Sequence, residues 1–330
     1  MRDKYIKDYE KDEEISEFFL VTESGSIKET KQGKPYGSLR AKDKTRDFEC
    51  KCWSENLSKI GENIIKSFNP GDVIKVKGIV DFYKDNPQIV FTQIRLATEN
   101  DIYDNSDFYK VAPIESIIMY NKIMNIIDIE IEDEEYRKVC KKIYDDHKQR
   151  LLYWPAAKLN HHACEGGLLW HTYRMTQIAL NLVKIYPHIN KSLLLSGVIL
   201  HDIGKISEFS YDNHIIDYTF SGNTLGHTLI GTMLVNNVAN DQKLPKEKKF
   251  LLEHMIASHH GNLEWGAIKE PRIMEAILLH EIDMIDSQIT KIEEQFEEIE
   301  NGNTIDIKIG KEYRSFYKPT NYINEVIYNI

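Results

Sequence analysis

Histidines and aspartates recur in a fixed order over residues 168–286, and this constellation constrains the chain more than any other feature. Its five motifs are Leu-Leu-Trp-His-Thr at 168–172, His-Asp-Ile-Gly-Lys at 201–205, Gly-His at 226–227, Ser-His-His-Gly at 258–261 and His-Glu-Ile-Asp-Met-Ile-Asp at 280–286. Neutral imidazoles with a few carboxylates make a nitrogen and oxygen ligand set that suits Mn, Fe, Co, Ni or Zn rather than calcium. The doublet His201-Asp202 is the most informative motif. A carboxylate can bridge two cations, which lie roughly 3.5–4 Å apart in such sites.

The order of these residues resembles a known family signature. His171, the doublet His201-Asp202 and the distant Asp283 are similar to the H…HD…D pattern of the HD phosphohydrolase superfamily, an all-helical, metal-dependent fold. Three further histidines resemble those of the members that hold two metals. The resemblance implies one divalent ion on His171, His201, Asp202 and Asp283, and a second on Asp202, His227, His259 and His260. Mn²⁺ is the favoured ion, and Co²⁺, Fe²⁺, Ni²⁺ and Zn²⁺ are the alternatives.

Four more residues lie close to this constellation in the sequence. Lys205 follows His201 by four residues and shares its helix face, so we interpret it as a catalytic cation aimed at a phosphate. Asp286 comes one turn after Asp283 and competes with it as a ligand. Asp283 matches the family pattern better, which leaves Asp286 as a partner of a ligand or a charge on a helix face. His161 and His162 contact substrate, orient a ligand or simply pack.

Length and charge bound the class of protein. A chain of 330 residues allows roughly two domains. The net charge of −10 argues against a chain-wide attraction to nucleic acid or to anionic membranes, so any nucleic-acid site must be a local basic patch. No stretch approaches the roughly 18 apolar residues of a membrane span, and four cysteines are too few and too scattered for a disulfide framework. We expect a soluble cytoplasmic protein without a membrane partner.

The N-terminal part has the pattern of a small β-barrel. Residues 1–15 are strongly charged and are predicted to be a flexible terminus. Beyond them we predict strands at 18–21, 36–42, 48–53, 73–83 and 88–96, with a helix at 56–68. Three strands, a helix and two strands is the order of an OB-fold, which we place at 16–98. The stretch 70–78 resembles the fourth strand of OB modules that bind nucleic acid.

A basic patch lies within this predicted barrel. Residues 24–53 contain eight Lys or Arg and four Asp or Glu, so eight minus four gives a local charge of +4. Aromatic side chains interleave with the cations, and unpaired nucleic acid is bound by such stacking platforms. The predicted contacts are Tyr36, Arg40, Lys42, Lys44, Arg46, Phe48 and Trp53. The alternative is that Phe48 and Trp53 belong to the barrel core and the lysines to a solvated face.

The remaining chain is predicted to be a linker and a helical domain. Polar residues at 99–112 form the linker, and isoleucines recur with helical spacing from residue 113 onward. The helical domain covers 113–330 and ends in a tail, where alternation at 305–316 indicates a strand pair or an ordered segment. The predicted fold class is therefore multidomain α+β, a small β-barrel (OB-fold) followed by an all-α HD domain.

A second resemblance covers almost the whole chain, from about residue 16 to residue 319. The run Trp-Pro-Ala-Ala-Lys-Leu-Asn-His-His-Ala at 154–163, the Ser-His-His-Gly motif and the OB module look like the YhaM-type 3′-5′ exoribonuclease family. This implies an Mn²⁺-dependent enzyme that shortens single-stranded RNA, and often single-stranded DNA, from the 3′ end. The released unit is expected to be a nucleoside 5′-monophosphate, and a homo-oligomer is compatible with the resemblance. The alternatives are a phosphohydrolase of small nucleotides or cyclic dinucleotides, and a non-catalytic single-strand-binding protein.

Overall fold

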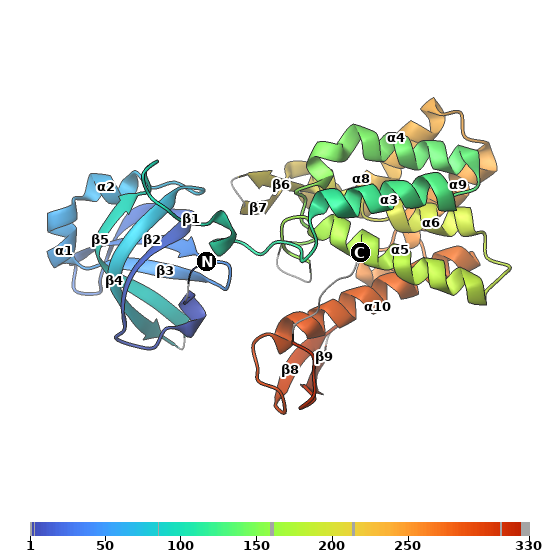
Figure 1. Cartoon of the computed structure of the whole chain (residues 1–330). Helices are drawn as coiled ribbons and strands as arrows, with labels where there is room; N and C mark the ends of the chain where they lie inside the picture. Colours follow the sequence, from blue (N-terminus) through green and yellow to red (C-terminus); the bar gives the residue numbers. More distant parts are fainter. Residues whose placement is uncertain are drawn as a thin grey trace. The chain divides into compact units, whose positions relative to one another are not determined.

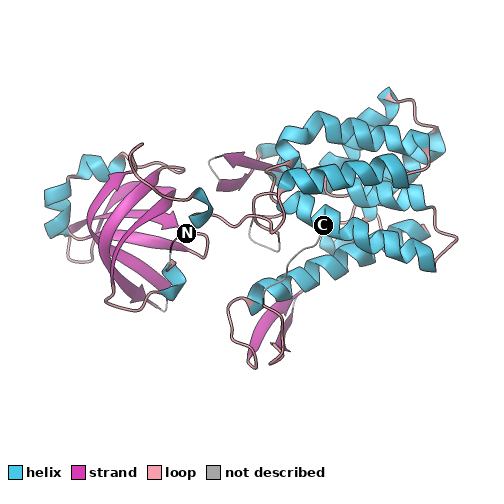
Figure 2. Cartoon of the chain, in the orientation of Figure 1, coloured by secondary structure: helices cyan, strands magenta, loops and turns pink. Residues whose placement is uncertain are grey.

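The structure is a computed structural model that describes residues 2, 4–84, 86–158, 162–212, 215–310 and 312–324. It divides into two compact units, residues 1–111 with 211–215 and residues 112–210 with 216–330. Strands dominate the first unit and helices the second (Figure 1, Figure 2). The predicted α+β fold class, a small barrel before a helical domain, is confirmed.

Five strands close the barrel of the first unit: β1 (Glu14–Glu29), β2 (Pro35–Lys42), β3 (Asp47–Cys52), β4 (Val73–Tyr83) and β5 (Asn86–Leu96). Their order around the barrel is β1-β2-β3-β5-β4, with β3 and β5 parallel and the other pairs antiparallel. The predicted helix at 56–68 is two short helices, α1 (Ser54–Ile60) and α2 (Glu62–Lys66), separated by Gly61 with a φ of 93°. The predicted order of strands and helix is confirmed.

Strand β1 extends well beyond the apolar run predicted at 18–21. Its first half pairs with β4 and its second half pairs with β2. Register shifts between Val21 and Ser26 mark the bend that lets one strand serve two sides of the barrel. Most side chains at both ends of β1 are polar and at least partly exposed, so no apolar run marks these ends in the sequence.

Residues 5–9 correct the prediction of a flexible N-terminal segment at 1–15. Ile6 is fully buried in the barrel core and Tyr9 is 8% exposed. A short 3₁₀ turn, η1 (Ile6–Asp8), lies between them, and the Ile6 N–H donates to Asp43 Oδ2 at 2.6 Å. Most residues of this segment are charged or polar and remain in water, so its overall composition does not reveal the two buried residues. Ile6 and Tyr9 are three positions apart, and this spacing brings them together in one turn.

The second unit is a bundle built around one buried helix. Its helices are α3 (Ser116–Glu130), α4 (Glu134–Leu151), α5 (Gly167–Ile185), α6 (Lys191–Leu200), α7 (Lys205–Glu208), α8 (Phe220–Asp241), α9 (Lys246–Ser258) and α10 (Met274–Phe296). Residues 192–200 of α6 are all buried, as expected of a helix that is apolar on every side. Helix α6 packs against α3, α4, α5, α9 and α10. The residues that follow it are thereby placed in the interior of the unit.

Two hairpins follow α7 and α10: β6 (Phe209–Asp212) with β7 (Ile215–Tyr218), and β8 (Thr304–Ile309) with β9 (Glu312–Tyr317). The second hairpin matches the alternation predicted at 305–316. Just after it, Lys318 is 3% exposed, and its Nζ donates to the carbonyl oxygens of Phe296 and Ile299 at 2.7 and 2.9 Å. This buried cation caps the end of α10. Across the described residues, no helix is both long and apolar enough to cross a membrane.

Candidate metal centre

The seven predicted metal ligands come from five segments of the helical unit and converge in its interior. They are His171 on α5, His201 and Asp202 after α6, His227 on α8, His259 and His260 after α9, and Asp283 on α10. The ligating atoms of His171, His201 and Asp283 lie within 4.8 Å of one another, and so do those of His227, His259 and His260. The structure thus forms two groups of three, which we call the first and the second group.

Asp202 lies between the two groups and faces each with a different oxygen. Its Oδ2 is 3.2 Å from His201 Nε2 and 3.8 Å from His171 Nε2. Its Oδ1 is 3.4 Å from His227 Nε2 and 3.8 Å from His259 Nε2. This is the arrangement that a bridging carboxylate requires.

Two of the carboxylates of α10 contact opposite nitrogens of one imidazole. Asp283 Oδ1 lies 3.4 Å from His171 Nε2, which faces the centre. Asp286 Oδ2 lies 2.7 Å from His171 Nδ1, on the far side of the ring. Asp286 therefore orients a predicted ligand, and of its two predicted roles the geometry favours the partner of a ligand over a free helix-face charge.

Two further side chains hold Asp286 in place. His162 Nε2 lies 2.8 Å from Asp286 Oδ2, and Arg174 Nε lies 2.6 Å from Asp286 Oδ1. His162 is 1% exposed, so the structure places it behind a predicted ligand rather than against substrate. Burial lowers the pKa of His162 to about 4, which leaves a neutral ring beside the carboxylate. His161 lies outside the described residues, and Arg174 carries no sequence motif that would have pointed to this role.

Two glycines allow the backbone segments of the centre to approach one another. A Cβ on Gly204 would lie 2.0 Å from the carbonyl oxygen of His227, so α7 and α8 can pack this closely only with glycine there. Gly226 has a φ of 71° and interrupts the helical geometry of α8 immediately before His227. This kink re-aims the chain at the point where the imidazole enters the centre.

The Nδ1 atoms of four imidazoles are engaged on the side away from the centre. Those of His201 and His259 lie 2.8 and 2.7 Å from the carbonyl oxygen three residues earlier in the chain. The Nδ1 of His227 lies 3.0 Å from Glu208 Oε1, which also accepts the His227 backbone N–H at 3.0 Å. With His171 held by its own carboxylate, each Nδ1 acts as the donor and each Nε2 faces the centre. Glu208 was missed because nothing in its local sequence marks it.

This donor set fits divalent cations. His259 Nε2 is buried and has no hydrogen-bond partner among the described residues, and the Nε2 atoms of His227 and His260 face each other at 3.2 Å. A buried acceptor without a partner is costly, and a cation would provide one. Three imidazoles and a carboxylate oxygen are ligands that borderline transition metals prefer over calcium.

Charged side chains in the centre have partners of opposite charge close by. Burial opposes the charge of Asp202, but Lys205, whose Nζ lies 2.6 Å from Asp202 Oδ2, and the adjacent imidazoles hold its pKa well below the usual range. Burial also opposes a charge on His171, yet its two carboxylate partners raise the pKa to about 10. Burial lowers the pKa of His260 to about 4. Burial also lowers the pKa of His259, so this ring and that of His260 present neutral ligand nitrogens.

The predicted nucleic-acid contacts on the barrel do not all lie on one surface. Tyr36 and Trp53 lie against each other on the outer face, with ring centroids 5.3 Å apart and 45° between the planes, and Trp53 is 42% exposed. Phe48 is 2% exposed and packs edge-on against Phe19 in the core, which contradicts its prediction as a contact. Phe48 alternates inward with Cys50 and Cys52 along β3, whereas Trp53 follows the end of that strand and is the N-cap residue of α1.

The four predicted cations differ in how free they are. Arg40 is paired with Asp47, Lys42 is half-buried, Lys44 lies 4.1 Å over the Tyr5 ring and Arg46 is exposed. Two lysines outside the predicted set neighbour aromatic side chains: Lys28 is paired in register with Tyr36, and Lys51 lies 5.4 Å from the centre of the Tyr83 ring. We call Lys28, Tyr36, Lys51, Trp53 and Tyr83 the aromatic face of the barrel.

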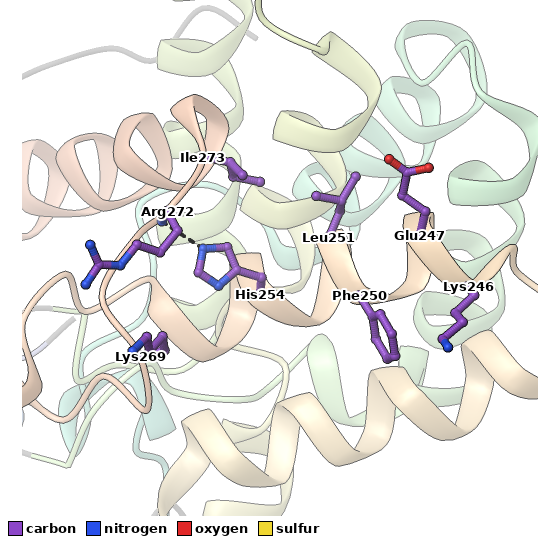
Figure 3. A pocket seen from close by; sticks show the side chains of 8 residues that line it. All are labelled: Lys246, Glu247, Phe250, Leu251, His254, Lys269, Arg272 and Ile273. Carbon is purple, nitrogen blue, oxygen red and sulfur yellow. Dashed lines mark hydrogen bonds between the residues drawn. The ribbon is translucent and has the colours of Figure 1, made fainter.

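A separate surface groove of about 620 Å³ runs along α9 (Figure 3). Phe250, Leu251 and Ile273 line it, with the long side chains of Lys246, Lys269 and Arg272 at its margins. No predicted metal ligand contributes to this groove. This groove and the predicted metal ligands thus lie in different places.

Comparisons with known proteins agree with this division. The family pattern of the HD domain matches residues 168–301, and that of an OB-fold nucleic acid-binding domain matches residues 21–97. Among solved structures, the second OB-fold domain of replication protein A from Methanococcus maripaludis is 19% identical, covers 30% of this chain and 98% of its own, and has a TM-score of 0.22. The SSB domain of a Synechococcus sp. protein is 8% identical, covers 26% and 94%, and has a TM-score of 0.21. At these scores the two alignments add nothing to the assignment.

The chain therefore combines an OB-fold nucleic acid-binding domain with an HD domain. HD domains are metal-dependent phosphohydrolases, so the helical unit is a hydrolase of this class with His and Asp clusters that can hold metal. The phosphohydrolase has a nucleic-acid-related context because both domains are in one chain.

Proposed function

We propose that this protein is a metal-dependent 3′-5′ exonuclease that removes nucleoside 5′-monophosphates from single-stranded RNA, with single-stranded DNA as a second substrate. The observation that carries the proposal is the position of Asp202 between two groups of imidazoles, in a chain that also contains an OB-fold domain. The bridged site is suited to a phosphodiester, and the barrel to an unpaired strand. The polarity from the 3′ end rests on the resemblance to YhaM-type exoribonucleases.

In this proposal the first group and the second group would each hold one ion, with Asp202 shared and Mn²⁺ as the favoured metal. The ions would supply a deprotonated water as nucleophile and would stabilise the attacking and leaving oxygens. Asp286 and Glu208 keep the rings of His171 and His227 in their productive orientation. Lys205 places a cation beside Asp202, where it would offset charge that develops on the phosphate oxygens.

The aromatic face of the barrel would supply affinity and not chemistry. Tyr36 and Trp53 lie side by side as a tilted pair, and Tyr83 is 60% exposed beside Lys51. Each base stacked on such a ring contributes about 1–3 kcal/mol, and the interaction tolerates any sequence. We propose the domain boundaries 16–98 for the barrel, 99–112 for the linker and 113–330 for the catalytic part, with residues 5–9 added to the barrel because Ile6 is in its core.

The deciding experiment compares linear and circular single-stranded RNA of one sequence in the presence of Mn²⁺. A 5′-labelled linear strand should give a ladder that shortens with time, and the circle should persist. A stable stem at the 3′ end should stall the ladder. Equal loss of both RNAs would mean internal cleavage and would refute the exonuclease.

Two further arms of the same gel separate the alternatives. Cleavage of a cyclic dinucleotide but not of the linear RNA would identify a small-molecule phosphohydrolase. Binding of the RNA without any cleavage would identify a binding protein. The variant Asp202→Asn, purified in the same way, controls for contaminating nucleases, because it should be inactive in every arm.

A further inference from the structure

The segment directly after His259 and His260 forms a compact loop, residues 261–268, which we call the platform loop. Gly261 and Gly266 have positive φ angles of 77° and 97°, a backbone conformation that glycine adopts without strain. Within the loop, the N–H groups of Trp265 and Ala267 both donate to the carbonyl oxygen of Asn262, at 3.0 and 3.2 Å. The loop closes back onto α9 where the Ile268 N–H donates to Ala257 at 2.9 Å. Its shape is therefore fixed by its own backbone.

The platform loop presents a half-exposed tryptophan on a fixed support. Trp265 is 50% exposed, and its ring centroid lies 5.9 Å from that of His280 with 36° between the planes. His280 is itself held in place, since its Nδ1 lies 2.9 Å from the carbonyl oxygen of His259. A Cβ on Gly261 would lie only 2.4 Å from the same imidazole, so the loop is pressed against it. The indole is therefore supported on one side and leaves half of its surface to solvent.

The platform loop and His280, which support Trp265, both lie next to residues of the metal centre. On the loop side, Gly266 approaches the ring of His260, because a Cβ there would lie 3.2 Å from His260 Nδ1. On the helix side, His280 precedes Asp283 by three residues and shares its face of α10. Trp265 thus precedes a glycine that approaches His260, and its ring lies against a histidine that shares a helix face with Asp283.

A role in packing alone does not account for this arrangement. A tryptophan that serves a core loses most of its accessible surface, as Trp154 and Trp170 do in the same unit, at 9% and 5% exposed. An exposed aromatic ring beside a site for phosphodiesters has a chemical use, since every nucleobase presents a π-face to stack on it.

We propose that Trp265 is the stacking platform for the base of the 3′-terminal nucleotide, with His280 as the positioning residue behind it. The ligand class is any nucleobase, because stacking selects a flat ring and not a sequence. The inference rests on the proposed nuclease function and adds a subsite to it. The terminal base lies on Trp265 while its phosphate occupies the metal centre, so Trp265 holds the end of the strand in register for removal of one nucleotide at a time.

The test uses two substrates of equal length, one with a normal 3′-terminal nucleotide and one whose last nucleotide lacks its base. Trp265→Ala should raise KM for the normal strand by about 10-fold, within the range expected for loss of one stacked base. It should leave KM for the abasic end unchanged, and Trp265→Phe should stay close to the natural protein on both. Leu263→Ala removes a similarly exposed apolar side chain of the same loop and should change neither value. An equal rise for both ends, or no rise at all, would overturn the proposal.

A binding measurement separates this inference from the nuclease proposal. A 2-aminopurine base at the 3′ end should lose fluorescence on binding to Asp202→Asn protein, and the added Trp265→Ala change should restore it. The same base at the 5′ end serves as the control and should not respond to Trp265→Ala. Natural protein that fails to shorten linear RNA would refute the nuclease function. Quenching that persists without Trp265 would refute the platform alone. Metal content and thermal unfolding of each variant show whether the adjacent His260 remains in place.

Discussion

The aromatic face of the barrel and the metal centre both gather charged and aromatic side chains, but they hold them in different ways. On the barrel, the Lys28 side chain is 51% exposed and its partner Glu49 lies 3.7 Å away. In the centre, Asp202 and His201 are 3% and 0% exposed, and their polar atoms have fixed partners. An exposed ion pair contributes about 0–1 kcal/mol because water and salt compete with it. A buried polar group that loses its partner bears its full desolvation cost.

The difference teaches how each region should respond to change. The aromatic face of the barrel should tolerate the loss of one contact at a time. Its side chains are at least partly exposed, and a bound nucleic-acid strand can use the remaining ones. The centre cannot tolerate such a loss, because four of its five imidazoles depend on a second residue for their orientation. Substitutions should therefore weaken binding in small steps on the barrel and stop turnover in the centre.

The largest effect is expected from Asp202→Asn. The substitution keeps the shape of the side chain but removes the charge that faces both groups. We expect turnover to fall by more than about 100-fold, since loss of an orienting partner one step further from the ions already costs up to about that much. Single-strand binding by the barrel should change less than twofold. Initial rates with Mn²⁺ and fluorescence anisotropy of a labelled strand measure the two effects.

Asp241→Asn is the matched control, because this exposed aspartate at the end of α8 lies outside the centre. It should retain natural turnover. If Asp202→Asn lost binding and turnover in parallel, the separation between the two regions would be wrong.

An intermediate effect is expected from Glu208→Gln. The amide oxygen can still accept the His227 backbone N–H, but it no longer provides a charge beside Nδ1. We expect affinity for one of the two ions to fall by about 10- to 100-fold, while the other ion stays bound. Equilibrium dialysis against Mn²⁺, followed by elemental analysis, counts the ions at each concentration.

Glu281→Gln, an exposed residue on α10, serves as the control and should bind both ions as the natural protein does. Excess Mn²⁺ should restore turnover to the Glu208→Gln protein. Simultaneous loss of both ions would show that the two groups form one inseparable site and not two unequal halves.

The smallest effect is expected on the barrel, from Lys28→Gln combined with Lys51→Gln. These lysines border the aromatic face, so their loss should reduce the slope of log affinity against log salt by about 0.7 for each phosphate contact removed. Lys44 and Arg46 lie at the β2–β3 turn, and the same pair of substitutions there should reduce the slope less. Titrations of a labelled strand at several salt concentrations give the slopes.

Lys59→Gln on α1 is the control, since this lysine is 70% exposed and pairs with Glu55, which is not a residue of the aromatic face. A larger change from Lys44 and Arg46 than from Lys28 and Lys51 would move the binding surface toward the turn. It would also return support to the cations that the sequence singled out first.

Much of this architecture is determined by local sequence patterns. A His-Asp doublet and a His-His doublet place ligand groups on adjacent positions whatever the tertiary fold, and their order along the chain carries the resemblance to the HD signature. The strands of the barrel follow from alternation with a period of two, which also places Phe48 on the buried face of β3 with Cys50 and Cys52. The prediction of Phe48 as a nucleic-acid contact was wrong because it rested on the mixture of aromatic and basic residues and not on this alternation.

Other features depend on contacts between residues far apart in the chain. Asp283 and Asp286 are three positions apart on one helix face, so the local pattern cannot tell them apart. The packing of α10 beside α5 distinguishes their positions, by setting one carboxylate against each nitrogen of His171. Glu208 reaches His227 across 19 residues only because Gly204 lets α7 and α8 approach. The identity and spacing of side chains are properties of the local sequence. Their hydrogen-bond partners depend on which segments pack together in the tertiary structure.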